Sequence, residues 1–382
     1  MGEYEVAALE CEGEKIGDIE HLDFVTVRLP FLHPFSISKA TWTCKEALLV
    51  RLEEGGIVAW GECVADPDPY YAYETTSTCA HVIRDFLWPC VEPGMTLGEL
   101  FGRWALVRGH GMAKAALENA LLDLFAKRRG LPLHEELGLP RRRVMSGVSL
   151  GIQDSPQALV DAAAEAVDSG YHRIKMKVKR GKDLEYARAV RERFPSLKLM
   201  VDANGDYSLT DAERLAELDE LGLMMIEQPL SYSDIYQHSK LQRKLRTPIC
   251  LDESILSLAD AAAAVELGAA RVINIKQGRV GGLVEAVKIA RYCAARGVPA
   301  WSGGMDETGI GRAVNIHLQA EPGFSLPGDT AETKRYFPED IVSPPVTLAE
   351  GGFIEIPGGP GIGVEVLPER LDRLTIARAR LK

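Results

Sequence analysis

An alternation of short apolar segments with amphipathic segments, beginning at about residue 144, limits the possible folds more than any other feature of this chain. The apolar segments have the length of strands, and they are 147–150, 173–178, 198–202, 224–227, 249–252, 272–275 and 299–301. Helical patterns lie between them, most clearly over 183–194, 209–221, 258–267 and 283–296. Seven or eight such units predict a parallel barrel, because crossover helices usually join parallel strands. A doubly wound open sheet is the structural alternative.

The first part of the chain has a different order of elements, with strands followed by helices. Alternating patterns predict strands over 24–29, 47–52 and 57–62, and a helix covers 112–124. The Gly- and Pro-rich segment 356–363 is not repetitive enough for a disordered linker, and we expect it to fold back onto the first domain. The predicted division is therefore an α+β domain at 1–143, a barrel at 144–330 and a returning segment at 331–382.

Charge and composition exclude several classes of protein. The 382 residues carry 44 Lys and Arg against 55 Asp and Glu, a net charge of −11, so neither nucleic acid nor an anionic membrane is an expected partner. No run approaches the ~20 apolar residues that span a bilayer, and the acidic terminus 1–5 lacks the layout of a secretory signal. Seven scattered cysteines without a C-x-x-C pair indicate reduced thiols and a cytoplasmic location.

Three acidic residues end three consecutive predicted strands. Asp202, Glu227 and Asp252 are 25 residues apart, one strand–helix unit each. In a barrel they would lie side by side at the C-terminal mouth, where such folds place their chemistry. Close carboxylates repel unless a cation lies among them, and oxygen ligands favour Mg²⁺, with Mn²⁺ or another divalent cation also possible. Each acid alone is explained as a helix N-cap or a loop ion pair, but three in register favour a metal site.

Further polar residues flank these acids. Asn204 and Glu253 are next to them in sequence and are candidates to support the ligands. Lys175 and Lys177 share one face of their strand, predicted to be the lumen, and Lys276 closes the strand after Asp252. The expected order around the mouth is Lys, Asp, Glu, Asp, Lys, with bases on opposite sides of a metal.

This arrangement indicates a reaction type. A substrate carboxylate at the metal acidifies its α-proton, a lysine removes that proton, and the metal stabilises the enediolate. The outcome is then return of the proton to the other face or loss of a leaving group.

The motifs of the chain resemble those of the enolase superfamily, in its muconate-lactonizing subgroup, and more closely those of the o-succinylbenzoate synthases and N-succinylamino acid (N-acylamino acid) racemases. The resemblance runs from about Leu22 over nearly the whole chain. Its marks include W-G-E-C at 60–63, K-M-K at 175–177, V-D-A-N at 201–204, I-E-Q-P-L at 226–230, L-D-E-S at 251–254, N-I-K at 274–276 and G-G-M-D-E-T-G at 303–309.

The resemblance implies a (β/α)7β TIM-like barrel with an N-terminal α+β capping domain completed by the C-terminal tail. It implies Lys177 and Lys276 as acid/base residues, Lys175 as electrostatic support, and Asp202, Glu227 and Asp252 as Mg²⁺ ligands. One base, Lys177, serves the synthase dehydration of menaquinone biosynthesis, whereas racemisation uses both lysines. Arg279 fits the pattern of racemising members. The residues expected to bind the carboxylate substrate are Ser149, Arg279, Trp301, Gly304, Met305 and Asp306, together with first-domain residues 35–42. We expect a homo-oligomer, because barrels of this kind often assemble.

Some positions depart from the family pattern. Gln277 stands where relatives usually have Pro, Asp306 where an apolar residue is usual, and 34–42 differs from the expected capping loop. The first ~20 residues resemble an extension. Dipeptide epimerisation and muconate cycloisomerisation remain alternatives, although the D-x-D element of many epimerases is missing near 301–307. A Schiff-base aldolase and a catalytically silent scaffold are further alternatives, which the acidic triad and the retained lysines disfavour.

Overall fold

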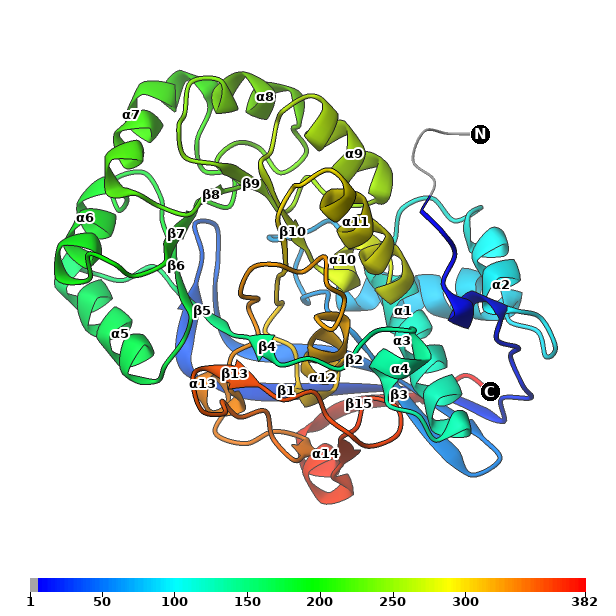
Figure 1. Ribbon diagram of the computed structural model, residues 1–382. Helices are drawn as coiled ribbons and strands as arrows, with labels where there is room; N and C mark the ends of the chain where they lie inside the picture. Colours follow the sequence, from blue (N-terminus) through cyan, green and yellow to red (C-terminus); the bar gives the residue numbers. More distant parts are fainter. Residues whose placement is uncertain (1–5) are drawn as a thin grey trace.

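The computed structural model describes residues 6–382, so the expectation for the acidic terminus lies outside the described residues. Two sheets organise the molecule (Figure 1). One has four strands in the order β15-β1-β2-β3, and the other has seven strands in the order β11-β10-β9-β8-β7-β6-β5. In Figure 1 the seven-stranded sheet curls, with helices along its outer side. No helix in residues 6–382 has the length and apolar character needed to cross a bilayer.

The seven-stranded sheet is parallel between every pair of neighbours. Its strands are β5 (Gly147–Leu150), β6 (Arg173–Lys177), β7 (Leu199–Asp202), β8 (Ile226–Glu227), β9 (Ile249–Leu251), β10 (Val272–Ile275) and β11 (Ala300–Ser302). Sequential strands are neighbours throughout and the order never reverses, so the doubly wound alternative is wrong. The predicted barrel-type sheet is confirmed.

An irregular segment, 324–329, occupies the gap between the two end strands. On one side, the backbone N–H of Ser325 donates to the carbonyl of Ala300 at 3.0 Å. On the other side, Gly147 N–H donates to the carbonyl of Gly328 at 2.7 Å. The segment therefore links β11 to the β5 edge and takes the place of the eighth strand.

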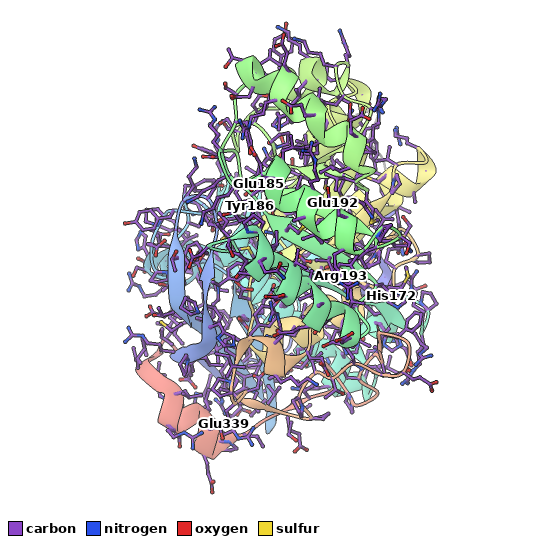
Figure 2. The ribbon with its side chains drawn as sticks, turned by 90° about the vertical axis from the view of Figure 1, so that its left-hand side faces the viewer. His172, Glu185, Tyr186, Glu192, Arg193 and Glu339 are labelled. Atoms are coloured by element: carbon purple, nitrogen blue, oxygen red, sulfur yellow. The ribbon has the colours of Figure 1, made fainter. Side chains whose placement is uncertain are left out.

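Helices cover the outside of the curled sheet, and several of them bury one apolar face against it. They include α5 (Pro156–Asp168), α6 (Leu184–Arg193), α8 (Tyr236–Gln242), α9 (Leu258–Glu266), α11 (Leu283–Ala295) and α12 (Gly309–Leu318). In α6, Tyr186, Ala187 and Val190 are buried against the barrel. Figure 2 shows the opposite face of α6 at the surface, where the exposed side chains include Glu192 and Arg193.

One expected barrel helix is interrupted. The pattern over 209–221 predicts a single helix, but the structure has a 3₁₀ turn at Leu209–Asp211, a short α7 (Ala212–Ala216) and a second 3₁₀ segment at Glu217–Leu221. Gly222 ends it with a left-handed backbone, φ 57°. The apolar residues of 209–221 do have helical spacing, but over so short a segment this spacing does not distinguish an α-helix, with 3.6 residues per turn, from a 3₁₀ helix, with 3 residues per turn.

The four-stranded cap sheet combines both ends of the described chain. Strands β1 (His21–Ser36), β2 (Thr41–Glu54) and β3 (Ile57–Cys63) form an antiparallel meander, and β15 (Thr375–Arg380) pairs antiparallel with β1. Helices α1 (Thr76–Val82), α2 (Leu97–Trp104) and α3 (Gly111–Arg129) follow the meander. Because most of α3 is buried, it is apolar on several faces rather than on one stripe. The exact domain boundaries at 143 and 330 stay predictions.

The hairpin formed by β1 and β2 is longer than the sequence pattern predicts, and its tip reaches the barrel mouth (Figure 1). The backbone N–H of Ile152, which follows β5, donates to the carbonyl of Ser36 at 3.1 Å. Lys39 Nζ lies 3.0 Å from Asp206 Oδ1, which belongs to the loop after β7. The hairpin tip therefore bridges from the cap to two barrel loops.

Candidate active site

Three buried carboxylates lie at one edge of the parallel sheet. Asp202 and Glu227 are the last residues of β7 and β8, and Asp252 directly follows β9. Asp202 is paired with Glu227 in the register of the strands, and Glu227 with Cys250. Parallel strands place their carboxyl ends at the same edge, so the 25-residue spacing becomes spatial proximity. All three side chains are almost completely buried.

Three lysines contact these carboxylates. Lys177 Nζ lies 2.6 Å from Asp202 Oδ2, and Lys276 Nζ lies 3.0 Å from Asp252 Oδ2. Lys175 Nζ lies 3.2 Å from Glu227 Oε2. Lys177 and Lys276 therefore contact the two outer acids of the row, with Glu227 between these acids. The shared inward face predicted for Lys175 and Lys177 is confirmed by their common contact with Asp202.

Asn204 and Glu253 connect the row of acids to Lys177. The Asn204 side-chain carbonyl accepts a hydrogen bond from Lys177 Nζ at 2.9 Å, and its amide donates to Glu253 Oε1 at 2.8 Å. The backbone of Asn204 is left-handed, φ 44°, and its N–H donates to Asp202 Oδ1 at 3.1 Å. Asn tolerates this conformation better than most residues, which explains an amide at this position.

The acids of the site differ in how strongly neighbouring cations stabilise their ionised forms. Burial, together with the neighbouring Asp202, raises the pKa of Glu227 to about 8, and burial beside Asp252 raises the pKa of Glu253 to about 7. Burial also opposes ionisation of Asp252, but Arg279 and Lys276 outweigh it and lower its pKa. Burial disfavours the charged form of Lys175, but Asp329, Glu227 and Asp202 hold its pKa well above the usual range.

A divalent cation fits the donor set of this row. In residues 6–382, no group of three or more His, Cys, Asp or Glu side chains is arranged to hold a metal ion as it stands. The reason is visible in the contacts: the lysine ammonium groups contact carboxylate oxygens of Asp202, Glu227 and Asp252. Glu227 Oε2 is buried without a hydrogen bond among the described residues, although Lys175 lies nearby. Crowded oxygens whose ionisation is unfavourable are the environment that Mg²⁺ relieves.

Two further residues of the site, Tyr71 and Asp329, are not predicted by any sequence pattern. Tyr71, from the loop after β3, accepts hydrogen bonds from Lys276 Nζ at 2.7 Å and from Arg279 at 3.1 Å, and donates to Asp252 at 3.3 Å. Asp329 lies in the segment 324–329 that closes the barrel, here called the closing segment. Its carboxylate lies 2.6 Å from Lys175 Nζ and 2.7 Å from the Arg173 guanidinium. Asp329 is 154 residues from Lys175 in the sequence, and only the fold places the two side chains together.

A cavity of about 60 Å³ opens onto the lysines. Of the expected substrate-binding residues, Ser149, Gly304, Met305 and Asp306 line it, and the cap contributes Phe31, Phe35, Ile37 and Trp42. A larger groove of about 1210 Å³ lies between the cap sheet and the C-terminal segment, but none of the clustered acids and lysines line it. The smaller cavity is therefore the candidate active-site cavity, because the three lysines line it.

Two expected substrate-binding residues do not line this cavity. Trp301 lies inside the barrel, where the Lys175 ammonium is 5.0 Å from its ring centroid and its indole N–H donates to Cys250 Sγ. Arg279 donates to Asp252 Oδ1 and to the backbone carbonyl of Ile255. In this structure they contact Lys175 and Asp252, and their role toward a substrate stays a prediction.

Comparisons with known proteins agree with this geometry. Residues 22–138 match the mandelate racemase / muconate lactonizing enzyme N-terminal domain, and residues 158–370 match the enolase C-terminal domain-like family. An o-succinylbenzoate synthase from Geobacillus kaustophilus is 46% identical over 361 residues, 94% of this chain and 96% of the relative. An N-succinylamino acid racemase from Amycolatopsis sp. is 45% identical over 355 residues, 92% of this chain and 96% of the relative.

The solved structures give the same result. A crystal structure of an enolase superfamily member from Listeria innocua has a TM-score of 0.90 and 38% identity, covering 95% of this chain and 99% of that chain. Matches of this extent include both the cap and the barrel. The chain belongs to the enolase superfamily, with the N- and C-terminal domains of the mandelate racemase / muconate lactonizing enzymes.

Proposed function

We propose that this protein is a Mg²⁺-dependent enzyme that removes the proton α to a carboxylate, acting as an o-succinylbenzoate synthase, an N-succinylamino acid racemase, or both. The observation that carries the proposal is the placement of Lys177 and Lys276 against the two outer acids of one buried row. The names of the relatives at 45–46% identity support the choice of these two reactions. The synthase reaction would serve menaquinone biosynthesis in the cytoplasm.

Asp202, Glu227 and Asp252 would hold the divalent cation. When bound, the cation neutralises the substrate carboxylate and the negative charge that develops when the α-proton leaves. The oxygens that would hold it belong to the same carboxylates that Lys177, Lys175 and Lys276 contact in this structure. Asn204 would then keep Lys177 in position through the 2.9 Å hydrogen bond to its ammonium.

The two lysines would have different roles in the two reactions. In racemisation, one lysine in its neutral form takes the α-proton while the other, as an ammonium, delivers a proton to the opposite face. In dehydration, Lys177 takes the α-proton and can return that proton to the departing hydroxyl on the same face, which releases water. Lys276 then contributes only positive charge near the developing enediolate.

Proton NMR in D₂O with Mg²⁺ tests the proposal. We expect α-deuteration of N-succinylamino acids, conversion of the dehydration substrate into o-succinylbenzoate, or both. Exchange confined to dipeptides would contradict the specificity while keeping the bases. A metal-bound protein that neither exchanges nor dehydrates any of these substrates would refute the proposal. Size-exclusion chromatography with light scattering would test the expected homo-oligomer.

A further inference from the structure

Asp306 lines the active-site cavity, and none of the described residues forms an ion pair with its carboxylate. Three carboxylates line this cavity: Asp66, Asp306 and Asp329. Asp66 Oδ1 lies 3.0 Å from Lys45 Nζ, and Asp329 Oδ2 lies 2.6 Å from Lys175 Nζ. Within residues 6–382, the side chain of Asp306 has neither a hydrogen bond nor a salt bridge.

The cations nearest to the cavity are already engaged. Lys45 is almost completely buried, and its ammonium donates to Asp66 and to the backbone carbonyl of Val64 at 3.2 Å. Lys177 and Lys276 contact Asp202 and Asp252. Each of these lysines is therefore paired with another carboxylate, and Asp306 is left without a lysine of its own.

The backbone holds Asp306 in a fixed orientation. Its φ is 53°, a left-handed conformation that Asp and Asn adopt more readily than other residues with side chains. On one side, a Cβ at Gly304 would lie 2.7 Å from the carbonyl oxygen of Asp329, so the chain passes close to the closing segment. On the other side, the carbonyl of Glu307 accepts from Arg312 at 2.6 Å and its carboxylate accepts from Asn315 at 2.8 Å.

The apolar part of the cavity lining suits a long alkyl chain. Phe31, Phe35, Ile37 and Trp42 come from the β1–β2 hairpin and line the same space as Asp306. A chain of methylene groups would pack against this lining, and a terminal cation would meet both the carboxylate and the aromatic rings. A terminal carboxylate at the same place would meet an uncompensated negative charge.

We infer that Asp306 binds an ammonium or guanidinium group at the far end of the substrate, so that the protein acts preferentially on N-acylated basic amino acids. This inference rests on the proposed function, since it assumes that the α-carbon lies between Lys177 and Lys276. Asp306 then determines specificity, because it pairs with the side chain of the substrate and does not move the proton.

The groups that face Asp306 predict how the preference depends on pH. Burial raises the pKa of Asp306 to about 6, although Lys45 opposes this shift. At neutral pH the carboxylate is therefore mostly ionised and pairs with a cation, whereas in more acidic solution it is protonated. The charged and titratable groups near it are Lys45 of β2, Asp66 of the loop after β3, Lys177 of β6, Glu307 of its own loop and Tyr336 of α13 (Thr333–Tyr336).

The test compares substrates that differ only at the end of the side chain. Rates of α-proton exchange would be measured for the N-succinyl derivatives of lysine, norleucine and 2-aminoadipate. We expect kcat/KM for the lysine derivative to exceed that for norleucine by about tenfold or more, the range of a charge-assisted pair, with 2-aminoadipate the poorest. The ratio of lysine to norleucine should fall as the pH drops below about 6.

The variant Asp306→Asn keeps the size of the side chain and tolerates the left-handed backbone, but it has no charge. We expect the lysine-to-norleucine ratio to fall toward one and the 2-aminoadipate derivative to improve. Glu46→Gln is the matched control, because Glu46 pairs with Arg28 on the cap and does not line the cavity. This control should keep the wild-type ratio.

The outcomes separate the inference from the proposed function. Exchange of all three substrates at similar rates, or a preference for lysine that survives Asp306→Asn, would overturn the role of Asp306 and leave the proposed reaction intact. Absence of exchange with any N-succinylamino acid, together with absence of dehydration, would instead overturn the proposed function on which the inference rests.

Discussion

At the scale of single residues, the two candidate bases differ in what holds them. Lys177 is held by Asp202 and by the side-chain carbonyl of Asn204. Lys276 is held by Asp252 and by the hydroxyl of Tyr71, at 2.7 Å. Tyr71 belongs to the cap, so the position of one base depends on both parts of the molecule, whereas the other is held within the barrel.

Replacing each base should separate the two reactions. Lys177→Ala should abolish both racemisation and dehydration, because it removes the only base of the dehydration. Lys276→Ala should abolish racemisation but keep part of the dehydration, since only a nearby positive charge is lost. We expect losses of about 10²–10⁴-fold in kcat where a base is removed. Single-turnover dehydration and deuterium exchange from each enantiomer would measure them.

The opposite pattern would reverse the assignment of the bases. Dehydration that persists in Lys177→Ala would show that another group removes the proton. Arg28→Ala is a suitable control, because this exposed cation lies on β1 and pairs only with Glu46 among the described residues.

The parts of the site that repeat with the strand–helix unit could be predicted from the sequence, whereas contacts between residues far apart in the sequence could not. Asp202, Glu227 and Asp252 repeat with the strand–helix unit, so their meeting follows from a parallel sheet alone. Tyr71 and Asp252 are 181 residues apart and follow no pattern, so their contact could not be predicted from periodicity. The structure places Trp301 against Lys175 and Cys250, which its strand pattern alone does not predict, and its expected contact with the substrate stays a prediction.

At the scale of elements, the β1–β2 hairpin controls access to the cavity. The hairpin supplies Phe35, Ile37 and Trp42 to the cavity lining, so a movement of the hairpin would change the space available to a substrate. Its tip is held by the 3.1 Å backbone hydrogen bond from Ile152 to Ser36 and by the Lys39–Asp206 ion pair. These contacts are few and partly exposed, which suits a segment that opens and closes.

Lys39→Ala should weaken closure over the substrate. Because the pair is partly exposed, its loss is worth about 0.2–1 kcal/mol, which corresponds to a rise in KM of up to about fivefold. The chemistry at Lys177 should be unaffected, so single-turnover dehydration at saturating substrate should keep its rate. A drop in that rate with no change in KM would show that Lys39 does not act through closure.

Elements with a strong period were predicted well and elements without one were not. The predicted strand at 147–150 coincides with β5, and the helix predicted over 283–296 corresponds to α11 at 283–295. The closing segment 324–329 has no strand pattern, because irregular backbone hydrogen bonds hold it in place. The hairpin was underestimated for a related reason, since its outer half is only partly buried and does not alternate between apolar and polar residues.

At the scale of the whole molecule, carboxylates of the cap bind the N-termini of barrel helices. Glu62 accepts from the backbone N–H groups of Thr308 and Gly311 at the start of α12, at 3.0 and 2.9 Å. Glu118 accepts from Val284 at the start of α11, at 3.0 Å. These hydrogen bonds to the first turns of α12 and α11 join the cap to the barrel and satisfy backbone N–H groups that have no partner within a helix. Burial raises the pKa of Glu62 to about 7 and that of Glu118 to about 8.

A buried histidine pair should make the stability of the whole fold depend on pH. His134 of α4 (Leu133–Glu136) and His317 of α12 stack, with their Nδ1 atoms 3.2 Å apart, and His317 Nε2 lies 3.2 Å from the carbonyl of Ile362. Burial lowers the pKa of His317 from 6.5 to about 3 and also lowers that of His134. Below pH 6.5 the histidines of the unfolded chain gain protons that the folded pair excludes, so the contribution of this pair to the free energy of unfolding should fall as the pH decreases from 6.5 toward 3.

His317→Gln should make this dependence less steep, although the lost packing lowers stability at neutral pH. Urea denaturation between pH 7 and pH 5 would measure both effects. His81→Gln, at an exposed position in α1, should leave the slope unchanged. An equal slope in the wild type and in His317→Gln would show that acid sensitivity arises elsewhere.

The pairing of β15 with β1 has a consequence for biosynthesis. Residues 375–380 complete the cap sheet beside residues 23–27, and β1 continues into the hairpin that covers the active site. On the ribosome, the strands of the cap meander emerge more than 300 residues before the strand that pairs with β1. The barrel strands can pair with one another during this time, but β1 has one unprotected edge until residues 375–380 emerge. A premature stop codon upstream of residue 375 should therefore yield a product with an open sheet edge, which chaperones and proteases recognise, rather than a partly active enzyme.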